Sequence, residues 1–288
     1  MSALGFTFDL TCFLINLLPL KMSGFLGRRL GDMIKLLGLR TEVARNNIKK
    51  ALQENPEIGE EIDIDLILKR CYRHFGQVAV EFLLLSGLQG KLADHHVLQG
   101  EENLKVAYER GDGVIIYTAH FGNWEWLGSV LAEKGYPVTA IARTQKQEII
   151  NSRINELRRK QGVDLVSDKK SGIREAIKKL KSGNVLVILG DQHAPHGTAL
   201  DFFNRKASVF TGAVQIASRY NVPIVPAFSV RNCFASFDIE LESPLKLPES
   251  LNTREEKFWL RKLLNLTEAK IREYPEQWLW LHRRWKLD

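Results

Sequence analysis

Tyr117-Thr118-Ala119-His120-Phe121-Gly122-Asn123-Trp124-Glu125-Trp126 is the stretch around which the rest of the sequence is arranged. The residues just before it, 113–116, form a short apolar run that is β-branched and begins with glycine, which predicts a buried strand. The residues just after it, 127–134, are typical of a helix, and Gly135 predicts its end. His120 is therefore expected at the point where a strand ends and a helix begins.

Glu125 lies one turn into the predicted helix, where its carboxylate is expected to reach back to the His120 imidazole. A histidine backed by a carboxylate is an arrangement that lets a neutral imidazole act as a general base near pH 7. The spacing alone is a weak signal, because His96 and His196 also have an acidic residue five positions later. Only His120 follows a strand-like run and opens a helix through a glycine turn. A partly buried histidine that is hydrogen-bonded at a helix start is the structural alternative.

From residue 111 onward, runs typical of strands alternate with runs typical of helices. Strands are predicted at 114–118, 138–142, 165–166, 185–189, 224–230 and 236–242. Helices are predicted at 122–134, 148–161, 171–181, 211–220 and 253–272. This βαβ succession predicts an α/β fold, with a largely parallel mixed sheet that is flanked by helices.

Residues 1–40 predict a helical segment that associates with a membrane. Residues 6–20 are largely apolar, although they contain Asp9 and Asn16, and as a helix they would span about 22 Å. That length is short of the roughly 30 Å hydrocarbon core, so a full span would need further residues. Residues 24–40 place their apolar side chains on one helical face with a basic flank, which is typical of a helix lying in a membrane interface. A helix packed on the protein's own core is the alternative.

The remaining residues, 41–288, are expected to form the main domain. Within it, 41–110 predict a helical lead-in, 111–250 the α/β core, and 251–288 a C-terminal helix followed by a tail rich in tryptophan and arginine. The tail tryptophans suit either a lipid headgroup boundary or packing against the sheet domain; they are Trp278, Trp280 and Trp285.

The composition suits an anionic partner, although a basic surplus is also common in proteins that bind no polyanion and decides nothing alone. The 288 residues carry 41 Lys and Arg against 34 Asp and Glu, a formal net charge of +7. Such a surplus suits nucleic acid, anionic lipid, a phosphorylated substrate or an acidic carrier protein, and no nucleic-acid-binding motif accompanies it. The three cysteines are widely spaced and form no CxxC pair, so free thiols are expected and a zinc site is not.

Short motifs follow one another along nearly the whole chain. They are Arg-Asn-Asn-Ile at 45–48, His-Phe-Gly-Asn-Trp-Glu at 120–125, Gly-Asp-Gln at 190–192, Asp-Phe-Phe-Asn-Arg at 201–205 and the Trp-rich segment 275–285. Each motif is weak alone. Together and in this order they resemble the bacterial lipid A biosynthesis acyltransferases, the lauroyl/myristoyl transferase family, in which a histidine and an acidic residue are separated by four positions.

The resemblance implies a glycerolipid acyltransferase-like fold and a membrane-associated O-acyltransferase. Such an enzyme moves a fatty acyl chain from an acyl-carrier-protein thioester to a hydroxyl of a lipid A precursor, in lipopolysaccharide biosynthesis at the cytoplasmic face of the cell inner membrane. One alternative is an acyl-CoA-dependent lysophospholipid or other glycolipid acyltransferase. An alternative of another class is an inactive membrane protein that binds anionic lipid.

The resemblance also makes His120 and Glu125 the candidate catalytic pair. His120 is expected to act as the general base, with Glu125 orienting the imidazole and stabilising the imidazolium. The amides around Gly122 and Asn123, at a helix N-terminus, are expected to hold the developing oxyanion or a substrate phosphate. A helix cap is the alternative role for Asn123.

Arg143, Asp191 and Arg205 are the other candidate substrate-binding residues. Arg143 corresponds to the arginine of an Arg-Pro pair in the resembled family, although Thr144 replaces the proline, and it is expected to bind a phosphate or polarise the thioester. Asp191 resembles the first aspartate of the family's Asp-Gln-Asp motif and follows the strand predicted at 185–189, where ligands of such folds bind. Arg205 is expected to meet a lipid phosphate or the carrier's phosphopantetheine.

Two rival chemistries have weaker support. Asp191, His193 and His196 offer oxygen and nitrogen ligands for a metal, but their loop lacks the helical spacing of a metalloprotease. No Gly-x-Ser-x-Gly motif occurs, so a serine hydrolase is not indicated. We therefore expect direct acyl transfer without a covalent enzyme intermediate, a metal ion or a cofactor.

Overall fold

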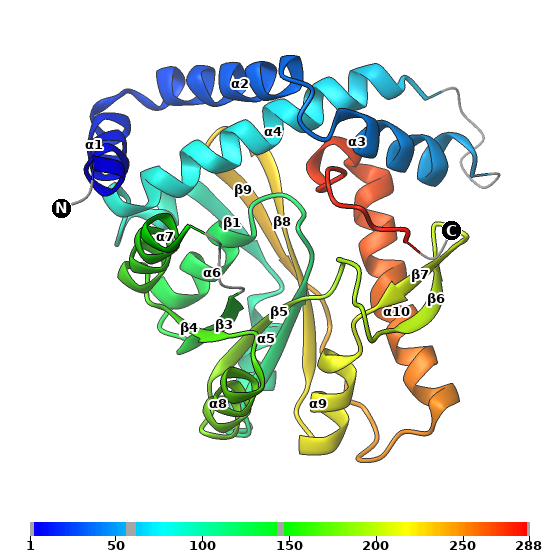
Figure 1. The fold of residues 1–288 in the computed structure, drawn as a ribbon. Coiled ribbons are helices and arrows are strands. Elements are labelled where there is room, and N and C mark those ends of the chain that lie inside the picture. Colours follow the sequence, from blue (N-terminus) through cyan, green and yellow to red (C-terminus); the bar gives the residue numbers. More distant parts are fainter. Residues whose placement is uncertain (1–2, 56–61, 143–146, 287–288) are drawn as a thin grey trace.

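The computed structural model describes residues 3–55, 62–142 and 147–286. Within them, a seven-stranded sheet has the order β1-β9-β8-β2-β5-β3-β4 and is covered by helices (Figure 1). Its strands are β1 (His96–Gln99), β2 (Val114–Thr118), β3 (Val138–Ala142), β4 (Val163–Ser167), β5 (Val185–Leu189), β8 (Ile224–Cys233) and β9 (Ser236–Leu241). All neighbouring strands are parallel except β8 and β9, so the α/β fold with a largely parallel mixed sheet is confirmed.

Helices cover both faces of this sheet. They are α1 (Ala3–Leu17), α2 (Leu20–Leu36), α3 (Thr41–Ile48), α4 (Ile64–Leu84), α5 (Glu101–Tyr108), α6 (Trp124–Glu133), α7 (Glu148–Lys160), α8 (Lys170–Lys181), α9 (Gly212–Tyr220) and α10 (Thr253–Glu273). Apolar residues of α5 and α6 share one buried cluster with β2, β3 and β5. Residues of α8, α9 and α10 share a second cluster with the opposite face of β2 and β5.

A separate hairpin and one edge strand are not among the predicted elements. The hairpin consists of β6 (Thr198–Phe202) and β7 (Arg205–Val209), which pair in antiparallel fashion. Its turn places Phe203 at φ 52° and Asn204 at φ 57°, in the left-handed region. β1 is a four-residue strand that is parallel to β9 at the edge of the sheet.

The helix α2 packs against α4 through its smallest side chains. Ser23, Gly24, Gly27 and Gly31 are its buried residues. A Cβ on Gly31 would lie 2.1 Å from the carbonyl oxygen of Tyr72 in α4, so only glycine permits this approach. The large side chains of α2 therefore face outward.

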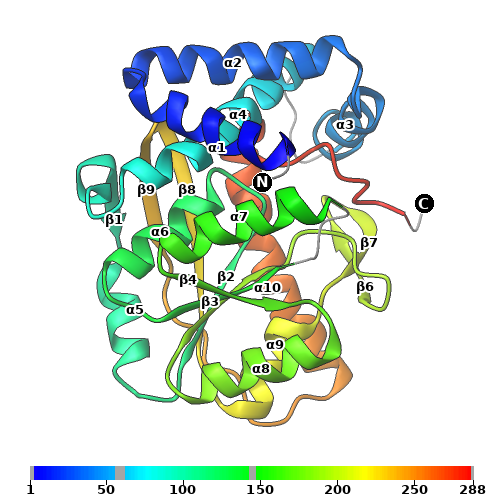
Figure 2. The same cartoon turned by 60° about the vertical axis from the view of Figure 1, so that its left-hand side comes forward.

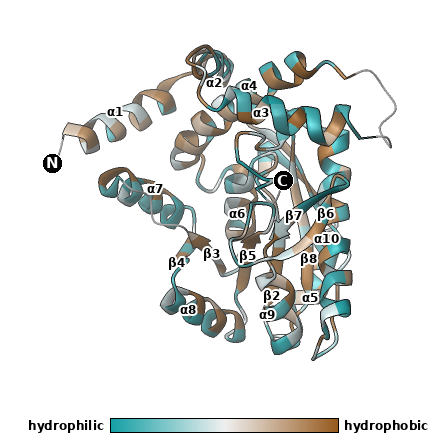
Figure 3. Cartoon of the chain, turned by 45° about the vertical axis from the view of Figure 1, so that its right-hand side comes forward, coloured by the Kyte–Doolittle hydropathy of each residue, from teal (hydrophilic) through white to brown (hydrophobic). Residues whose placement is uncertain are grey.

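The helix α1 lies beside α7 at the edge of the molecule (Figures 2 and 3). The polar residues of its otherwise apolar sequence make contacts with the body. Asp9 forms an ion pair with Arg153 of α7 at 2.8 Å. The side-chain amide of Asn16 donates to the Leu83 carbonyl oxygen at the end of α4. No helix in the described ranges is both long and apolar enough to cross a membrane.

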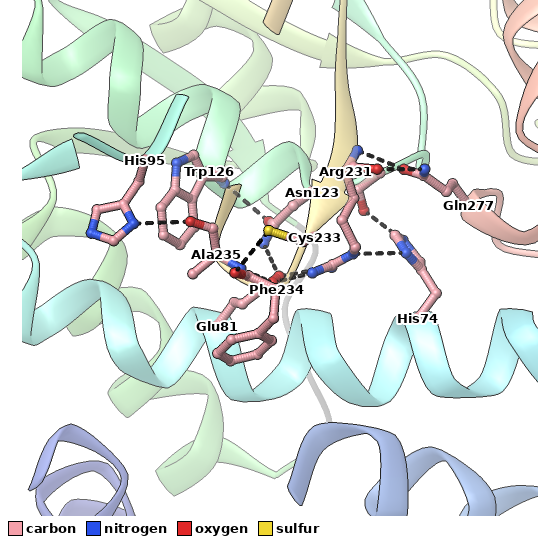
Figure 4. Close-up of polar contacts among 11 residues, drawn as sticks. His74, Glu81, His95, Asn123, Trp126, Arg231, Cys233, Phe234, Ala235 and Gln277 are labelled. Atoms are coloured by element: carbon pink, nitrogen blue, oxygen red, sulfur yellow. Dashed lines mark hydrogen bonds and ion pairs between the residues drawn. The ribbon is translucent and has the colours of Figure 1, made fainter. Parts of the chain in front are cut away.

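A buried ionic network connects α4 to the start of α6 (Figure 4). Glu81 of α4 is fully buried and forms a bidentate ion pair with Arg231 of β8, one arm of which measures 2.7 Å. The same carboxylate accepts hydrogen bonds from the Asn123 side chain and the Ala235 amide, each at 2.9 Å. Burying a carboxylate is costly unless it is paired and hydrogen-bonded, and here both conditions are met.

His74 extends this network to the turn before α6. Its Nδ1 accepts a hydrogen bond from Arg231 Nε at 3.1 Å, so its Nε2 carries the proton and donates to the Gly122 carbonyl oxygen at 3.0 Å. Burial lowers the pKa of His74 well below its ordinary value, and the neighbouring Arg231 guanidinium lowers it further, against the hydrogen bond to Gly122. The folded protein therefore holds this imidazole in its neutral form.

His74→Gln is expected to weaken the pH dependence of folding stability. The unfolded chain binds a proton at His74 near the ordinary pKa of about 6.5, whereas the folded chain does not. The contribution of His74 to the free energy of unfolding is therefore fully present above that pH. Below it, the contribution falls by about 1.4 kcal/mol per pH unit. Glutamine can accept from Arg231 and donate to Gly122 but does not titrate.

Urea unfolding of both proteins at about pH 7.5 and about pH 5 measures this difference. The free energy of unfolding should fall less for the variant than for the wild type. An equal fall in both would contradict a neutral, buried His74.

Candidate active site

His120 lies between β2 and α6, as the sequence predicted. The turn after it requires glycine, because Gly122 has φ 55° and a Cβ there would lie 1.6 Å from the Ser229 carbonyl oxygen. Asn123 then caps α6, since its Oδ1 accepts a hydrogen bond from the Trp126 amide at 3.0 Å. The sharp turn leaves the His120 side chain at the carboxyl end of the sheet.

Asp191 is the partner of the His120 imidazole. Oδ1 of Asp191 lies 2.8 Å from His120 Nδ1. The two residues meet because β2 and β5 are parallel neighbours, with Thr118 opposite Leu189, so both chains leave the sheet at the same edge.

The environment of Asp191 favours its ionised form. The side chain is only 2% exposed, and burial acts to raise its pKa. The charge of His120, and the hydrogen bonds from His120 and from the Trp278 indole, outweigh burial and hold the pKa of Asp191 below its ordinary value. An ionised carboxylate can only accept, so His120 Nδ1 donates and its Nε2 is the basic nitrogen.

His120 Nε2 is directed toward Gln192 and the cavity. The Gln192 amide nitrogen lies 3.2 Å from it, and the Trp124 ring meets the imidazole at a centroid distance of 4.9 Å. His120 is 22% exposed, whereas Asp191 behind it is buried. A substrate hydroxyl can therefore approach the imidazole only from the side of Nε2.

The prediction that Glu125 orients the imidazole is wrong. Its carboxylate forms a bidentate ion pair with Arg158 of α7, with Nη2 to Oε1 at 2.5 Å and Nε to Oε2 at 2.9 Å. It also accepts from the Trp124 indole at 3.1 Å. The ring of His120 turns toward β5, whereas Glu125 turns toward α7, where a guanidinium satisfies both of its oxygens. Glu125 nevertheless lines the same cavity as His120.

The predicted substrate-binding role of Gly122 and Asn123 is also wrong. The Gly122 amide donates to the Gln277 carbonyl oxygen at 2.9 Å, and the Asn123 amide donates to that of Ser229 at 3.3 Å. The Asn123 side chain is fully buried between Glu81 and the start of α6. These groups shape the turn and are already satisfied, so they are not available to an oxyanion or a phosphate.

The remaining predicted residues fall in different places. Asp191 is a partner of His120 and Trp278 and does not face substrate, which corrects its predicted binding role. Arg143 lies outside the described residues. Arg205 of β7 lies 3.9 Å from Glu54 and is not among the residues that line the cavity. Within the described ranges, no three His, Cys, Asp or Glu side chains are placed to hold a metal ion.

A cavity of about 860 Å³ adjoins the imidazole. Its walls include alternate residues of three strands, which share one face of the sheet: Val138, Ala140, Val163, Leu165, Val187 and Leu189. Gly128 of α6 lies against this wall. The polar residues His120, Glu125, Arg158 and Gln192 also line the cavity. The cavity therefore has one apolar wall, formed by the sheet, beside a polar lining that includes His120, the Glu125–Arg158 ion pair, Arg40 and Asp168.

Sequence reasoning missed Trp278, Gln192 and Arg158 as members of the site. Trp278 is buried and its indole nitrogen lies 2.8 Å from Asp191 Oδ2. The tail tryptophans pack inside the protein, which was one of the two predicted alternatives, with Trp280 fully buried and Trp285 stacked on Phe202. A usable signal for Gln192 was its place directly after Asp191.

Comparison with known proteins identifies the family. The profile described as Bacterial lipid A biosynthesis acyltransferase matches residues 4–287. The lipid A biosynthesis palmitoleoyltransferase of Escherichia coli is 24% identical over 279 residues, which cover 93% of this chain and 86% of the relative. The phosphatidylinositol mannoside acyltransferase of Mycobacterium tuberculosis is 21% identical over 134 residues, which cover 45% of this chain and 42% of the relative.

A comparison with solved structures gave a further match. It is the 1-acyl-sn-glycerophosphate (LPA) acyltransferase PlsC from Thermotoga maritima, with a TM-score of 0.41 and 16% identity, over 87% of this chain and 98% of that one. The profile match extends over nearly all of the chain, including the histidine turn, the Asp191 loop and the tryptophan tail. The chain belongs to the bacterial lipid A biosynthesis acyltransferase family and is an acyltransferase that acts on lipid substrates.

Proposed function

We propose that this protein is a membrane-associated O-acyltransferase that moves a fatty acyl chain from an acyl-carrier-protein thioester to a hydroxyl of a lipid A precursor. One observation carries the proposal: a histidine held by a buried carboxylate opens onto a cavity that has an apolar wall. An acyl transfer between two lipid-like substrates needs a base for the acceptor hydroxyl and an apolar site for the chain. Both needs are met within this one chamber.

The reaction follows from the orientation of the imidazole. His120 Nε2 takes the proton of the acceptor hydroxyl while the oxygen attacks the thioester carbonyl carbon. As the tetrahedral intermediate collapses, the C–S bond breaks, the ester C–O bond remains, and the imidazolium returns the proton to the leaving thiolate. Asp191 stabilises the imidazolium between these steps, because its buried carboxylate lies 2.8 Å from Nδ1.

The cavity suits the acyl chain of the donor. Each buried methylene contributes about 0.8 kcal/mol of transfer free energy, so an extended apolar wall binds a long chain well. The net charge of +7 supports an acidic carrier protein as the donor, with acyl-CoA as the alternative.

The outward side chains of α1 and α2 support attachment to a membrane, and we propose the cytoplasmic face of the inner membrane as its place. Leu36 is 87% exposed, Leu17 65% and Phe13 60%, although all three are large and apolar. The small residues of α2 and the polar residues of α1 face the body, which reverses the usual pattern of a soluble helix. We expect these helices to lie in the interface with their apolar faces in the acyl region.

His120→Ala and Asp191→Asn should both abolish most acyl transfer. Loss of the base should reduce kcat by about 10²- to 10⁴-fold. Asparagine at 191 presents an N–H to Nδ1, which moves the ring proton to Nε2 and leaves no basic nitrogen toward substrate, so a similar loss is expected. The assay follows labelled acyl chains from carrier protein or CoA to lipid A precursor by thin-layer chromatography.

Glu125→Gln serves as the comparison for these variants. It alters a carboxylate that lines the cavity without contacting the imidazole, so it should retain far more activity than Asp191→Asn. Circular dichroism confirms that each variant is folded. If Glu125→Gln lost more activity than Asp191→Asn, then Glu125 would be the functional partner of the imidazole in place of Asp191.

Gly128→Leu should shift the preferred acyl chain to shorter lengths. A Cβ at this position would lie 3.5 Å from a Val163 methyl group, so alanine fits and leucine projects into the cavity. Competition among carrier proteins loaded with chains of different length measures the preference. Gly128→Ala is the control, and a uniform loss for all lengths in the leucine variant would mean that the chain binds elsewhere.

Phe13→Glu combined with Leu17→Glu should release the protein from lipid vesicles. Charged residues at these exposed positions cost insertion energy but break no contact with the body. Flotation with vesicles that contain anionic lipid measures the bound fraction. Val106→Glu is the matched control, because Val106 of α5 is 65% exposed and lies away from α1. Equal flotation of all three proteins would remove α1 from the membrane contact.

A further inference from the structure

The C-terminal tail, residues 277–284, runs beside His120. The Gly122 amide donates to the Gln277 carbonyl oxygen at 2.9 Å, and the Leu279 amide donates to the His120 carbonyl oxygen at 3.0 Å. Trp278, between these two contacts, forms a β-bridge with Phe121. The tail is thus hydrogen-bonded to the backbone on both sides of the histidine turn.

A second set of contacts fixes the tail from the side of the helices. The side-chain amide of Asn47, in α3, donates to the carbonyl oxygens of Trp280 and His282, each at 2.7 Å. The Arg284 side chain is fully buried and donates to the Ser208 carbonyl oxygen at 2.7 Å. These bonds place the tail in one position relative to the strand ends.

The Trp278 indole is aimed at Asp191. Its Nε1 lies 2.8 Å from Oδ2, the oxygen that His120 does not use. The residue is 1% exposed, and its ring is held edge-on by Trp280 at a centroid distance of 4.6 Å and by Phe202 at 5.6 Å. The donor therefore has little freedom to move, and neither does the carboxylate that accepts from it.

We infer that Trp278 is the positioning residue of this site, which fixes the Asp191 carboxylate so that Oδ1 stays on His120 Nδ1. Without the indole, the carboxylate keeps only its contacts with the side chain and backbone of His120 and can rotate about its Cβ–Cγ bond, whereas a carboxylate held from two sides cannot. In a buried site such a donor is worth more than in water, because no solvent can replace it. This role rests on the proposed function of His120 as the base.

Trp280 provides an internal control for the effect of packing. It is fully buried in the same aromatic cluster, and its indole donates to the Pro275 carbonyl oxygen at 2.6 Å. Trp278→Phe and Trp280→Phe thus each remove one indole N–H and the same amount of ring. Only the first removes a donor from Asp191.

The test compares the two variants in the full-length protein. Trp278→Phe should lower kcat about tenfold or more with little change in KM, because Trp278 does not line the cavity and acts through Asp191. Trp280→Phe keeps an aromatic ring beside Trp278 and leaves the donor to Asp191 in place, so it should keep kcat within about twofold. Thermal unfolding of both variants shows how much each change destabilises the fold, and equal destabilisation with unequal kcat separates positioning from packing.

A spectroscopic measurement makes the test independent of turnover. In protein labelled with ¹⁵N-histidine, the Nδ1–H resonance of His120 reports its bond to Asp191. It should be protected from exchange with water in the wild type and in Trp280→Phe, and broadened or lost in Trp278→Phe. Asp191→Asn supplies the reference for a site in which that bond is gone.

The outcomes separate the two proposals. Equal losses of kcat in both variants, with an unchanged His120 resonance, would overturn the role of Trp278. Absence of acyl transfer by the wild type would overturn the proposed function, whereas the resonance would still decide the coupling between Trp278 and His120. If Trp278→Phe does not fold, a benzothiophene side chain at 278 keeps the ring, removes the N–H and should give the same loss of kcat.

Discussion

The structure of the site depends on one buried carboxylate. Asp191 is placed out of contact with water, where an unpaired negative charge would cost several kcal/mol. A histidine and a tryptophan satisfy its two oxygens, and they lie 71 and 87 residues from it in the sequence, on either side. The parallel pairing of β2 with β5 brings the histidine, and the returning tail brings the indole. Fold and chemistry are therefore linked through the same two hydrogen bonds.

The helix α4 connects the site to the outer helices. One side of it accepts the glycine face of α2, and another side supplies His74 and Glu81 to the turn that follows β2. Both contacts are tight, the first because no Cβ intervenes and the second because charges are paired without water. The apolar surface of α2 and the turn that carries His120 are thus both packed against α4.

Much of the fold could be predicted because its central strands are buried on both faces. The runs at 114–118 and 185–189 are continuous and apolar, and the structure places strands at these residues. β1 escaped prediction because four half-exposed residues at a sheet edge carry little pattern. The β6–β7 hairpin escaped because Phe203 occupies a left-handed position that usually signals glycine or asparagine. The residue types at these positions therefore did not indicate the β1 strand or the β6–β7 hairpin.

The site was predictable only where it is local. His120 could be found from its strand, its glycine turn and its helix, which are contiguous in the sequence. Its partner could not, because the adjacency of β2 and β5 is set by the order of strands in the sheet, and β3 and β4 intervene along the chain. The nearby Glu125 matched the expected spacing, and the structure pairs it with Arg158 instead. Sequence proximity is a poor guide to the orientation of a side chain at a sharp turn.

Trp278 follows both His120 and Asp191 in the sequence, and this order has a consequence for synthesis. The ribosome produces the histidine, the aspartate and the surface helices long before it adds this indole. A growing chain can thus contain both His120 and Asp191 while the carboxylate still lacks its tryptophan donor. The hydrogen bonds around Asp191 are completed only after residue 278 has been added, and a chain that stalls before that point holds the carboxylate by His120 alone.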